Sequence, residues 1–257
     1  MAMLRAFATT AFFFATTTGL HIAQPRLRRS QPLAACAAAD GPLPKLCVLD
    51  LDMCVWRPEM YELYEVPQAG ECEIRGDLNG RGQGVTGVKS GGDVIQLFPG
   101  ALVALQEMAD GVHEGMRFAV ASSADTPLAE EIGRAAMKIL EVLPGVTVYD
   151  VLVKGWEDEP MQPPAPGGFE RGPVNLQIGR QAPLTSDKSR THFPALRDGT
   201  GVPYDEMLFF DDSVWSDHCR MVEANCKGVV VQRTPRGMQE GEWRNGLKKF
   251  AASKAGN

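Results

Sequence analysis

The sequence lacks three features, each of which would point to a different class of protein. It has six cysteines among 257 residues but no Cys-x-x-Cys pair, so neither a zinc site nor a disulfide framework is indicated. The body of the chain has no Lys/Arg-rich tract and the net charge is −6, which argues against binding to a nucleic-acid backbone. No apolar stretch reaches the ~20 residues of a membrane-spanning helix, so we expect no membrane span in the mature protein. With 44% hydrophobic residues, the chain can instead bury a full-sized core.

Acidic residues are also absent before Asp40, and this part of the chain differs in composition from everything after it. It contains four arginines, five threonines and an apolar patch around residues 11–15, and without it the chain has a net charge of −10. Such N-termini are typical of organelle transit peptides, although Arg5 before an apolar stretch also fits a secretory signal. We therefore expect residues 1–40 to be a targeting segment, disordered or cleaved. A plastid is the first destination to consider, with the mitochondrion or the secretory pathway as alternatives.

The remaining chain alternates between short apolar runs and segments with helical periodicity. The runs that favour strands lie at residues 46–49, 116–121, 148–153, 206–210 and 227–232. Helices are expected over residues 99–110, 126–143, 187–198, 213–225 and 240–253. Thr126 followed by Pro127 provides a cap and a first-turn proline for the clearest of them. The alternation predicts an α/β protein in which helices cover both faces of a mostly parallel, Rossmann-like sheet, in three α/β/α layers.

Two regions interrupt this alternation inside a predicted domain of residues 41–254. Residues 57–97 are rich in glycine and directly follow the first strand, so we expect a small lid insert made of loops and a β-hairpin. Residues 155–186 combine several prolines with an acidic cluster, a composition that favours an extended, mobile loop. No internal repeat is present.

A pair of carboxylates closes the first predicted strand. Asp50 and Asp52 are two residues apart, and because side chains alternate along an extended segment, both can project to the same side. Two adjacent carboxylates repel each other unless a positive charge lies between them. A hard divalent cation such as Mg²⁺ satisfies oxygen ligands of this kind and pairs with phosphate. The alternative is that both residues only close a strand in a turn.

Other polar residues follow at the ends of later strands, where ligands bind in doubly wound sheets. Ser122 and Ser123 precede the capped helix, whose first N–H groups favour a phosphate. A pair of aspartates, residues 211–212, ends the strand at 206–210. Before that strand, Lys188 at the start of a predicted helix can neutralise phosphate charge. Each signal alone is weak, and their order along the chain is what makes them informative.

In this order the motifs resemble those of the haloacid dehalogenase superfamily of aspartyl phosphatases, and within it the magnesium-dependent phosphatase family. The resemblance covers about residues 45–252. The matching segments are Asp50-Leu51-Asp52-Met53-Cys54-Val55-Trp56, Leu97-Phe98-Pro99-Gly100, Ala121-Ser122-Ser123, Lys188-Ser189-Arg190-Thr191-His192-Phe193 and Phe209-Phe210-Asp211-Asp212. The resemblance implies a magnesium-dependent phosphomonoester hydrolase acting on a phosphorylated small molecule or a phosphoprotein. Phosphotyrosine-like, sugar-linked and amine-linked phosphates all remain open as substrates, as does the oligomeric state.

The resemblance also implies a role for each matching residue. Asp50 would be the nucleophile that forms an aspartyl-phosphate, and Asp52 the acid that protonates the leaving alcohol and then the base that activates water. Ser122, with Ser123 beside it, and Lys188 would bind the phosphoryl oxygens.

The implied Mg²⁺ ligands are Asp50, the backbone carbonyl of Asp52, and Asp212, with Asp211 or Asp217 in support. Lys154, which follows the run at 148–153, is a rival for the lysine role.

Three positions depart from the family pattern. Cys54 replaces a threonine, Ser123-Ala124 replaces Arg-Thr, and Ser216 replaces an asparagine. They motivate an alternative class, a catalytically weak fold member that acts as a binding or scaffold protein. A mutase that passes the phosphoryl group to a second sugar is a third hypothesis, but the insert at 57–97 is small for a cap that excludes water.

Several other residues are better explained without a catalytic role. His192 and His218 are expected to pack or cap locally, because the aspartate pair already provides acid–base chemistry. Trp56 is expected to pack at the hinge of the lid, with a role as a substrate platform left open. The glycine pattern at residues 82–87 matches a dinucleotide-binding motif but lacks the strand before it and the helix after it.

Overall fold

A five-stranded parallel sheet forms the centre of the part of the protein that the computed structural model describes, residues 41–165, 168–183 and 185–256. The predicted targeting segment, residues 1–40, lies outside the described residues. The strand order is β11-β10-β1-β6-β9. The bounds are Leu46–Leu49 for β1, Arg117–Ser122 for β6, Leu176–Ile178 for β9, Met207–Asp211 for β10 and Val230–Arg233 for β11. Because β1 lies between β10 and β6, the residues that follow these three strands meet at one edge of the sheet.

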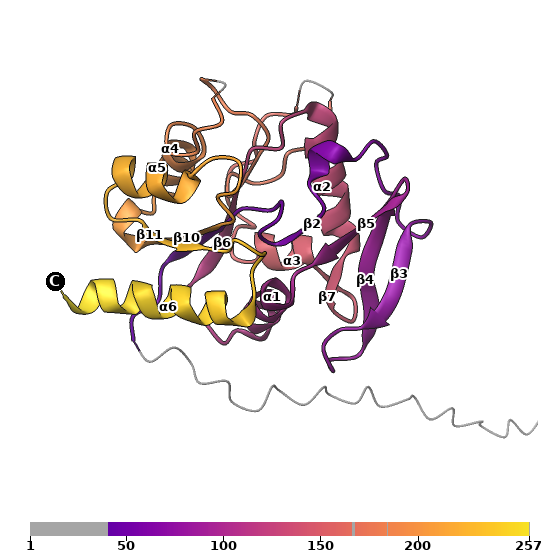
Figure 1. Cartoon of the computed structure of the whole chain (residues 1–257), viewed down its shortest axis with the longest axis horizontal. Coiled ribbons are helices and arrows are strands. Elements are labelled where there is room, and N and C mark those ends of the chain that lie inside the picture. The colour runs from indigo at the N-terminus through magenta and orange to yellow at the C-terminus, as the bar shows by residue number, and fades with distance from the viewer. Residues whose placement is uncertain (1–40, 166–167, 184, 257) are drawn as a thin grey trace, which may run out of the picture. The chain divides into compact units, whose positions relative to one another are not determined.

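Alternating side chains of the central strands build a hydrophobic core on each face of the sheet. In β1, Cys47 and Leu49 belong to one core, whereas Leu46 and Val48 belong to the other. Helices α1 (Pro99–Asp110), α2 (Pro127–Ile139), α3 (Val148–Val153) and α6 (Glu240–Ala255) cover the first face. Helices α4 (His192–Thr200) and α5 (His218–Asn225) cover the second, as Figure 1 shows. The predicted three-layer α/β/α fold is confirmed.

A second, antiparallel sheet occupies the glycine-rich insert, where the sequence predicted loops and a single hairpin. Its order is β2-β5-β4-β3, with bounds Trp56–Arg57, Asp93–Leu97, Gln83–Ser90 and Glu73–Asp77. Gly84 is required in β4, because an added Cβ would lie 2.4 Å from a carboxylate oxygen of Glu141. That carboxylate accepts a 2.8 Å hydrogen bond from the backbone N of Val85 and ties the insert to the hairpin of β7 (Glu141–Leu143) and β8 (Val146–Thr147).

The run at residues 148–153, predicted as a strand, is instead helix α3. Thr147 and Asp150 form a capping box, with a 3.1 Å bond from the Asp150 backbone N to the Thr147 hydroxyl and a 2.8 Å bond back from the Thr147 N. Val148, Val151 and Leu152 are buried, which is the spacing of a helix face. The sheet obtains its fifth strand from β9, three residues within the segment 155–186 that was predicted as a mobile loop.

Three predicted helix boundaries were also wrong. Helix α2 ends at Ile139 and not at residue 143, because the chain enters the β7–β8 hairpin. Helix α4 begins at His192 and not at residue 187, because the Asp187 carboxylate accepts bonds from the Ser189 N (3.0 Å) and Oγ (2.6 Å) and forms a turn first. Helix α5 begins at His218, after Asp217 caps it with a 3.0 Å bond from the Arg220 N.

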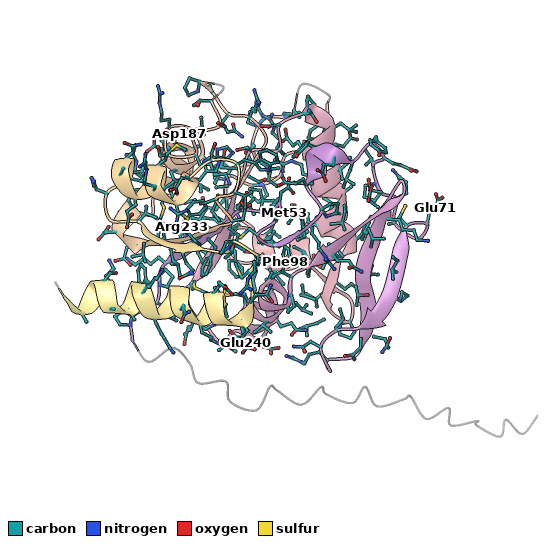
Figure 2. The ribbon with its side chains drawn as sticks, in the orientation of Figure 1. Met53, Glu71, Phe98, Asp187, Arg233 and Glu240 are labelled. Carbon is teal, nitrogen blue, oxygen red and sulfur yellow. The ribbon has the colours of Figure 1, made fainter. Side chains whose placement is uncertain are left out.

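Side chains fill the space between the sheet and the helices on both faces, as Figure 2 shows. Among the residues that the structure describes, no helix is both long enough and apolar enough to cross a membrane.

Candidate active site

Asp50 lies in the first turn after β1 and is 7% exposed. Its backbone N donates a 3.0 Å bond to the Phe210 carbonyl, which continues the pairing of β1 with β10 by one residue. The chain then turns sharply, and the Leu51 carbonyl accepts bonds from the backbone N of Val55 (2.8 Å) and Trp56 (3.1 Å). Met53 lies in this turn in the left-handed region, with φ of 54°. The strand pairing and the turn together fix where the Asp50 carboxylate is presented.

Lys188 connects the end of strand β1 to the end of strand β10. Its Nζ lies 2.8 Å from Asp50 Oδ1 and 2.7 Å from Asp211 Oδ2, and the side chain is almost fully buried. Burial lowers the pKa of Lys188, but the two carboxylates outweigh burial and raise it above its ordinary value. The pKa of Asp50 is raised, first by burial and then by its aspartate neighbours, while Lys188 opposes the shift. Lys188 is therefore a permanent cation at the floor of the site.

Lys154, the predicted rival for this role, lies elsewhere. Its Nζ donates 3.1 Å bonds to the carbonyls of Met108 and Ala109, at the end of helix α1. The structure thus places Lys188 and not Lys154 beside the aspartates.

A cluster of three carboxylates surrounds the position expected for a metal ion. Oxygens of Asp50, Asp211 and Asp212 lie within 4.8 Å of one another. Asp211 has both oxygens engaged, because Oδ2 binds Lys188 and Oδ1 accepts bonds from the Ser213 N (2.7 Å) and Oγ (3.0 Å). Asp212 Oδ2 is buried and has no hydrogen-bond partner among the residues that the structure describes. Burial, followed by the charge of Asp211, raises the pKa of Asp212.

An unpartnered buried carboxylate oxygen costs free energy, and a hard cation with oxygen ligands removes that cost. The donor set therefore fits a divalent cation, held by Asp50 and Asp212, with Asp211 positioning Lys188. Asp217, considered as a supporting ligand from the sequence, instead caps helix α5 and pairs with Arg233.

Asp52 has surroundings that differ from those of Asp50. Its carboxylate accepts a 2.9 Å bond from Trp56 Nε1 and a 3.0 Å bond from the Met60 backbone N. Burial raises the pKa of Asp52 to about 7, against the lowering effect of these two bonds. A carboxyl group with this pKa can hold or release a proton at neutral pH. Trp56 is fully buried, so its role is to position Asp52 and not to act as a substrate platform.

Cys54, where the family pattern has threonine, is fully buried below this turn. Burial raises the pKa of its thiol well above the ordinary value, so the group stays neutral. The orientation of the turn is supplied by backbone bonds, since the Cys54 carbonyl accepts a 2.9 Å bond from the Met238 N and the Met53 N donates a 2.8 Å bond to the Trp56 carbonyl. The missing hydroxyl is therefore not needed to hold the turn.

Ser122 and Ser123 end strand β6 and line the same cavity as the aspartates. The Ser122 carbonyl accepts bonds from His192 Nε2 and the Gly179 backbone N, both 3.0 Å. The buried Ser123 Oγ has no hydrogen-bond partner within the described part of the chain. A hydroxyl without a partner is able to donate a hydrogen bond to a phosphoryl oxygen.

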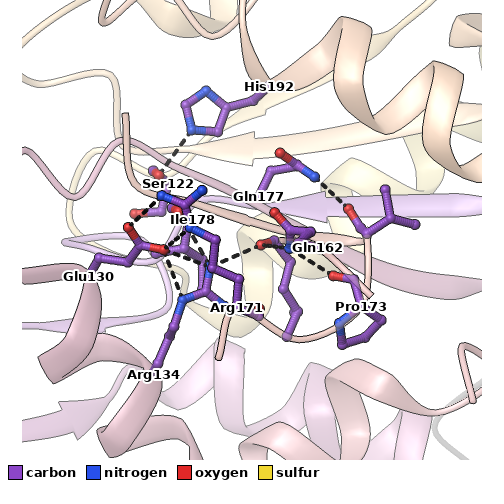
Figure 3. A network of polar contacts seen from close by, with 11 residues as sticks. Ser122, Glu130, Arg134, Gln162, Arg171, Pro173, Gln177, Ile178 and His192 are labelled. Carbon is purple, nitrogen blue, oxygen red and sulfur yellow. Dashed lines mark hydrogen bonds and ion pairs between the residues drawn. The ribbon is translucent and has the colours of Figure 1, made fainter. Parts of the chain in front are cut away.

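A network of buried charges lies behind the serine pair (Figure 3). The Glu130 carboxylate binds Arg134 (3.1 Å) and Arg171 (3.0 Å), and Arg134 also reaches the backbone carbonyls of Leu176 and Ile178. These bonds fix the end of strand β9 beside the end of β6, so the network positions the serines without touching the cavity.

His192 and His218 begin helices α4 and α5. His192 is fully buried, and burial together with Lys188 lowers its pKa to about 3, so its neutral ring holds the Ser122 carbonyl. His218 lines the cavity, and burial lowers its pKa to about 4. The structure therefore gives His192 the local packing role expected from the sequence.

The aspartates, the serine pair and Lys188, which we call the floor, lie at a cavity of 480 Å³. This volume suits a small-molecule ligand. Three residues at its mouth were not predicted from the sequence: Glu59, Tyr61 and Trp215. Trp215 Nε1 donates a 3.1 Å bond to Glu59 Oε1, and the rings of Tyr61 and Trp215 meet edge to face at 6.5 Å. No local sequence pattern points to them, because Glu59 and Trp215 are 156 residues apart in the chain.

Two further residues that line the cavity, Arg180 and Asp125, form an ion pair at 3.2 Å. The cavity is lined by every residue predicted for phosphate binding and catalysis: Asp50, Asp52, Ser122, Ser123 and Lys188. Of the two further residues predicted as metal ligands, Asp212 lines the cavity and Asp211 does not.

A parallel sheet with a cluster of aspartates and a buried lysine at one edge is the arrangement expected of a phosphatase of the haloacid dehalogenase type. The chain belongs to the acid phosphatase family, whose model matches residues 42–253. The resemblance found in the sequence is therefore confirmed, and the protein is a phosphatase that acts on a phosphorylated substrate.

Comparison with other proteins gives one similar solved structure to report. It is the N-terminal part of the protein BF1531 from Bacteroides fragilis, which contains a phosphatase domain complexed with Mg. The match has 15% sequence identity and a TM-score of 0.43, and covers 83% of this chain but 41% of that chain. No curated protein matches the sequence.

Proposed function

We propose that the protein is a Mg²⁺-dependent phosphomonoester hydrolase that acts through an aspartyl-phosphate on Asp50. The observation that carries the proposal is the Lys188 ammonium held between Asp50 and Asp211 at the floor of the cavity. A carboxylate attacks a phosphate only if the charge repulsion between the two is screened, and this ammonium provides part of the screening. Phosphotyrosine-like and sugar- or amine-linked phosphates are the proposed substrate range.

In the first step, an Asp50 oxygen forms a bond to phosphorus while the bond between phosphorus and the leaving alcohol breaks. Asp52, protonated at a pKa of about 7, gives its proton to the leaving oxygen. In the second step, Asp52 takes a proton from water as the water oxygen bonds to phosphorus, and the bond from phosphorus to Asp50 breaks. Phosphate leaves, and both aspartates return to their starting states.

The phosphoryl oxygens are held by Lys188 and by the hydroxyls of Ser122 and Ser123. The unpartnered Ser123 Oγ supports this role, since it gains a hydrogen bond when phosphate enters. Asp50, the Asp52 backbone carbonyl and Asp212 would hold the Mg²⁺, with Asp211 in support through Lys188. When bound, the cation supplies positive charge that neutralises the phosphoryl oxygens.

Hydrolysis of p-nitrophenyl phosphate by the full-length chain tests the proposal. We expect turnover that requires Mg²⁺, disappears with excess EDTA and returns when Mg²⁺ is added. Asp50→Asn is expected to lose activity by at least ~10³-fold, because the amide oxygen is a poor nucleophile. Quenching the wild-type enzyme with acid during turnover of ³²P-labelled substrate should leave acid-stable, hydroxylamine-sensitive label on the protein. Activity no higher than that of Asp50→Asn would favour the alternative of a binding or scaffold protein.

We also propose import into a plastid for residues 1–40, on their composition alone. A fusion of residues 1–45 to a fluorescent protein, expressed in plant cells, should accumulate in plastids. Mitochondrial or secretory fluorescence would select one of the alternative destinations.

A further inference from the structure

The mouth of the cavity has a chemistry that the phosphatase reaction itself does not use. Glu59, Tyr61 and Trp215, which we call the mouth cluster, come from two different segments. Glu59 and Tyr61 follow β2, at and in the short 3-10 helix Met60–Glu62, and Trp215 follows β10. The Glu59 carboxylate accepts the Trp215 indole N–H at 3.1 Å, and Tyr61 meets Trp215 edge to face. Tyr61 is 43% exposed and Trp215 is 76% exposed, so both rings offer free surface to a bound molecule.

The charges that face this cluster favour a cation. Among the described residues, no basic side chain forms an ion pair with Glu59. Three basic side chains in the described part of the chain line the cavity. Lys188 is engaged with Asp50 and Asp211, Arg180 is engaged with Asp125, and burial lowers the pKa of His218 to about 4, so its ring is neutral at pH 7. A positively charged group near Glu59 would therefore meet one carboxylate without a counterion and two aromatic rings. Such carboxylate and aromatic surroundings are typical of sites for ammonium groups.

We propose, on the basis of the proposed phosphatase function, that the mouth cluster is a leaving-group subsite for phosphomonoesters whose alcohol carries an ammonium group. The phosphate would lie on the floor, against Lys188 and the serines. The ammonium would lie at the mouth, against the Trp215 and Tyr61 rings with Glu59 as its counterion. Floor and mouth thus recognise opposite charges at the two ends of one zwitterionic substrate, and the aspartates and Glu59 disfavour an anionic leaving group.

Two phosphate esters of the same shape, one with and one without an ammonium charge, test the proposal. Phosphocholine carries a quaternary ammonium, and 3,3-dimethylbutyl phosphate replaces that nitrogen with carbon. We expect the Mg²⁺-loaded wild-type enzyme to have kcat/KM for phosphocholine higher by roughly 3- to 30-fold, the range that cation–π contacts provide. Because both esters have the same reacting bond, a substitution that slows the chemical step for both leaves the ratio of their kcat/KM values unchanged.

Trp215→Leu and Glu59→Gln should each bring this ratio towards one. Tyr64→Leu is the matched control, because Tyr64 is also an exposed aromatic of the insert, 75% exposed, but does not line the cavity. The control should keep the wild-type ratio. Unfolding midpoints of all three variants establish that they are folded.

A wild-type ratio of one or below overturns the inference, as does a preference that survives both Trp215→Leu and Glu59→Gln. If p-nitrophenyl phosphate is hydrolysed but neither ester is, the subsite is refuted while the phosphatase function stands. If none of the three is hydrolysed above the Asp50→Asn level, the proposed function fails and the subsite fails with it.

Discussion

The floor and the mouth of the cavity are built in opposite ways. At the floor, Asp50, Lys188 and Asp211 are buried, and each is held by strand pairing or by another charge at 2.7 to 2.8 Å. At the mouth, Tyr61 and Trp215 are exposed and lie on loops. Buried charges that depend on one another tolerate little change, whereas exposed loop residues can vary at small cost in stability. The floor is therefore fixed by the sheet, whereas the mouth, where we propose that the leaving group binds, can vary more freely.

The largest expected effect comes from removing the floor cation. Lys188→Met leaves Asp50 and Asp211 facing each other with no ammonium between them, and breaking a buried ion pair in this way costs about 3–5 kcal/mol of unfolding free energy. We expect kcat for p-nitrophenyl phosphate to fall by at least ~10³-fold. Urea unfolding and steady-state kinetics measure the two effects.

Lys154→Met is the control for that variant, since Lys154 bonds only to the carbonyls of Met108 and Ala109 among the described residues. Its kcat should stay close to that of the wild type. If Lys188→Met kept wild-type activity and stability, the distinction between a rigid floor and an adaptable mouth would be lost.

Asp52→Asn tests proton transfer at the boundary between floor and mouth. The variant keeps the shape of the side chain but has no proton to donate, so kcat/KM for an alkyl phosphate, which reports the step in which the alcohol leaves, should fall by about 10²- to 10⁴-fold. p-Nitrophenolate leaves without protonation, so the loss for p-nitrophenyl phosphate should be markedly smaller. Asp125→Asn, at another residue that lines the cavity, should change neither rate by more than about twofold. Equal losses on the alkyl and aryl esters would rule out Asp52 as the acid.

His192 is expected to make the free energy of unfolding depend on pH. The pKa of His192 is lowered to about 3 in the folded protein, first by burial and then by Lys188, and is about 6.5 in an unfolded chain. Between these values the unfolded chain binds a proton that the folded protein does not. The free energy of unfolding should therefore decrease as pH falls below about 6.5, by about 1.4 kcal/mol per pH unit from this residue.

His192→Gln keeps a donor for the Ser122 carbonyl but does not titrate. Urea unfolding from pH 7 to pH 4.5 should give a shallower pH dependence for this variant than for the wild type. Parallel curves would contradict the assignment.

The smallest expected effect lies at the mouth. Arg180 and Asp125 are each about half exposed in their 3.2 Å ion pair. A double-mutant cycle with Arg180→Ala and Asp125→Ala should give a coupling free energy of about 1 kcal/mol or less, which decreases with added salt. A coupling as large as that at the floor would show that this ion pair is also rigid.

Much of the floor could be predicted because its residues follow strands. Asp50, Ser122 and Asp212 each come directly after a buried apolar run, and parallel strands bring such positions to one edge. Lys188 lies beside Asp50 and Asp211, where the sequence placed a cation, but it precedes helix α4, which begins at His192. Helix α3 was mistaken for a strand, because a short apolar run fits either element and the capping by Thr147 was overlooked.

The mouth could not be predicted, because no local pattern connects its parts. Glu59 and Trp215 are 156 residues apart in sequence, and their hydrogen bond exists only because β1 and β10 are neighbours in the sheet. The different contacts of Asp211 and Asp212 could not be predicted from the sequence either. Which of two adjacent aspartates binds Lys188 depends on the turn at Ser213 and on where a distant lysine lies.

The sequence by itself determined the α/β architecture and which side chains follow the strand ends, because hydrophobic alternation and residues at strand ends act locally along the chain. The tertiary structure alone decided the state of those groups. Burial brings the pKa of Asp52 to about 7, and Asp212 is left with an unpartnered oxygen. The tertiary structure also decided which side chains form the mouth cluster. The physical reason is that desolvation and charge pairing depend on neighbours brought together by the sheet, and these are not neighbours in sequence.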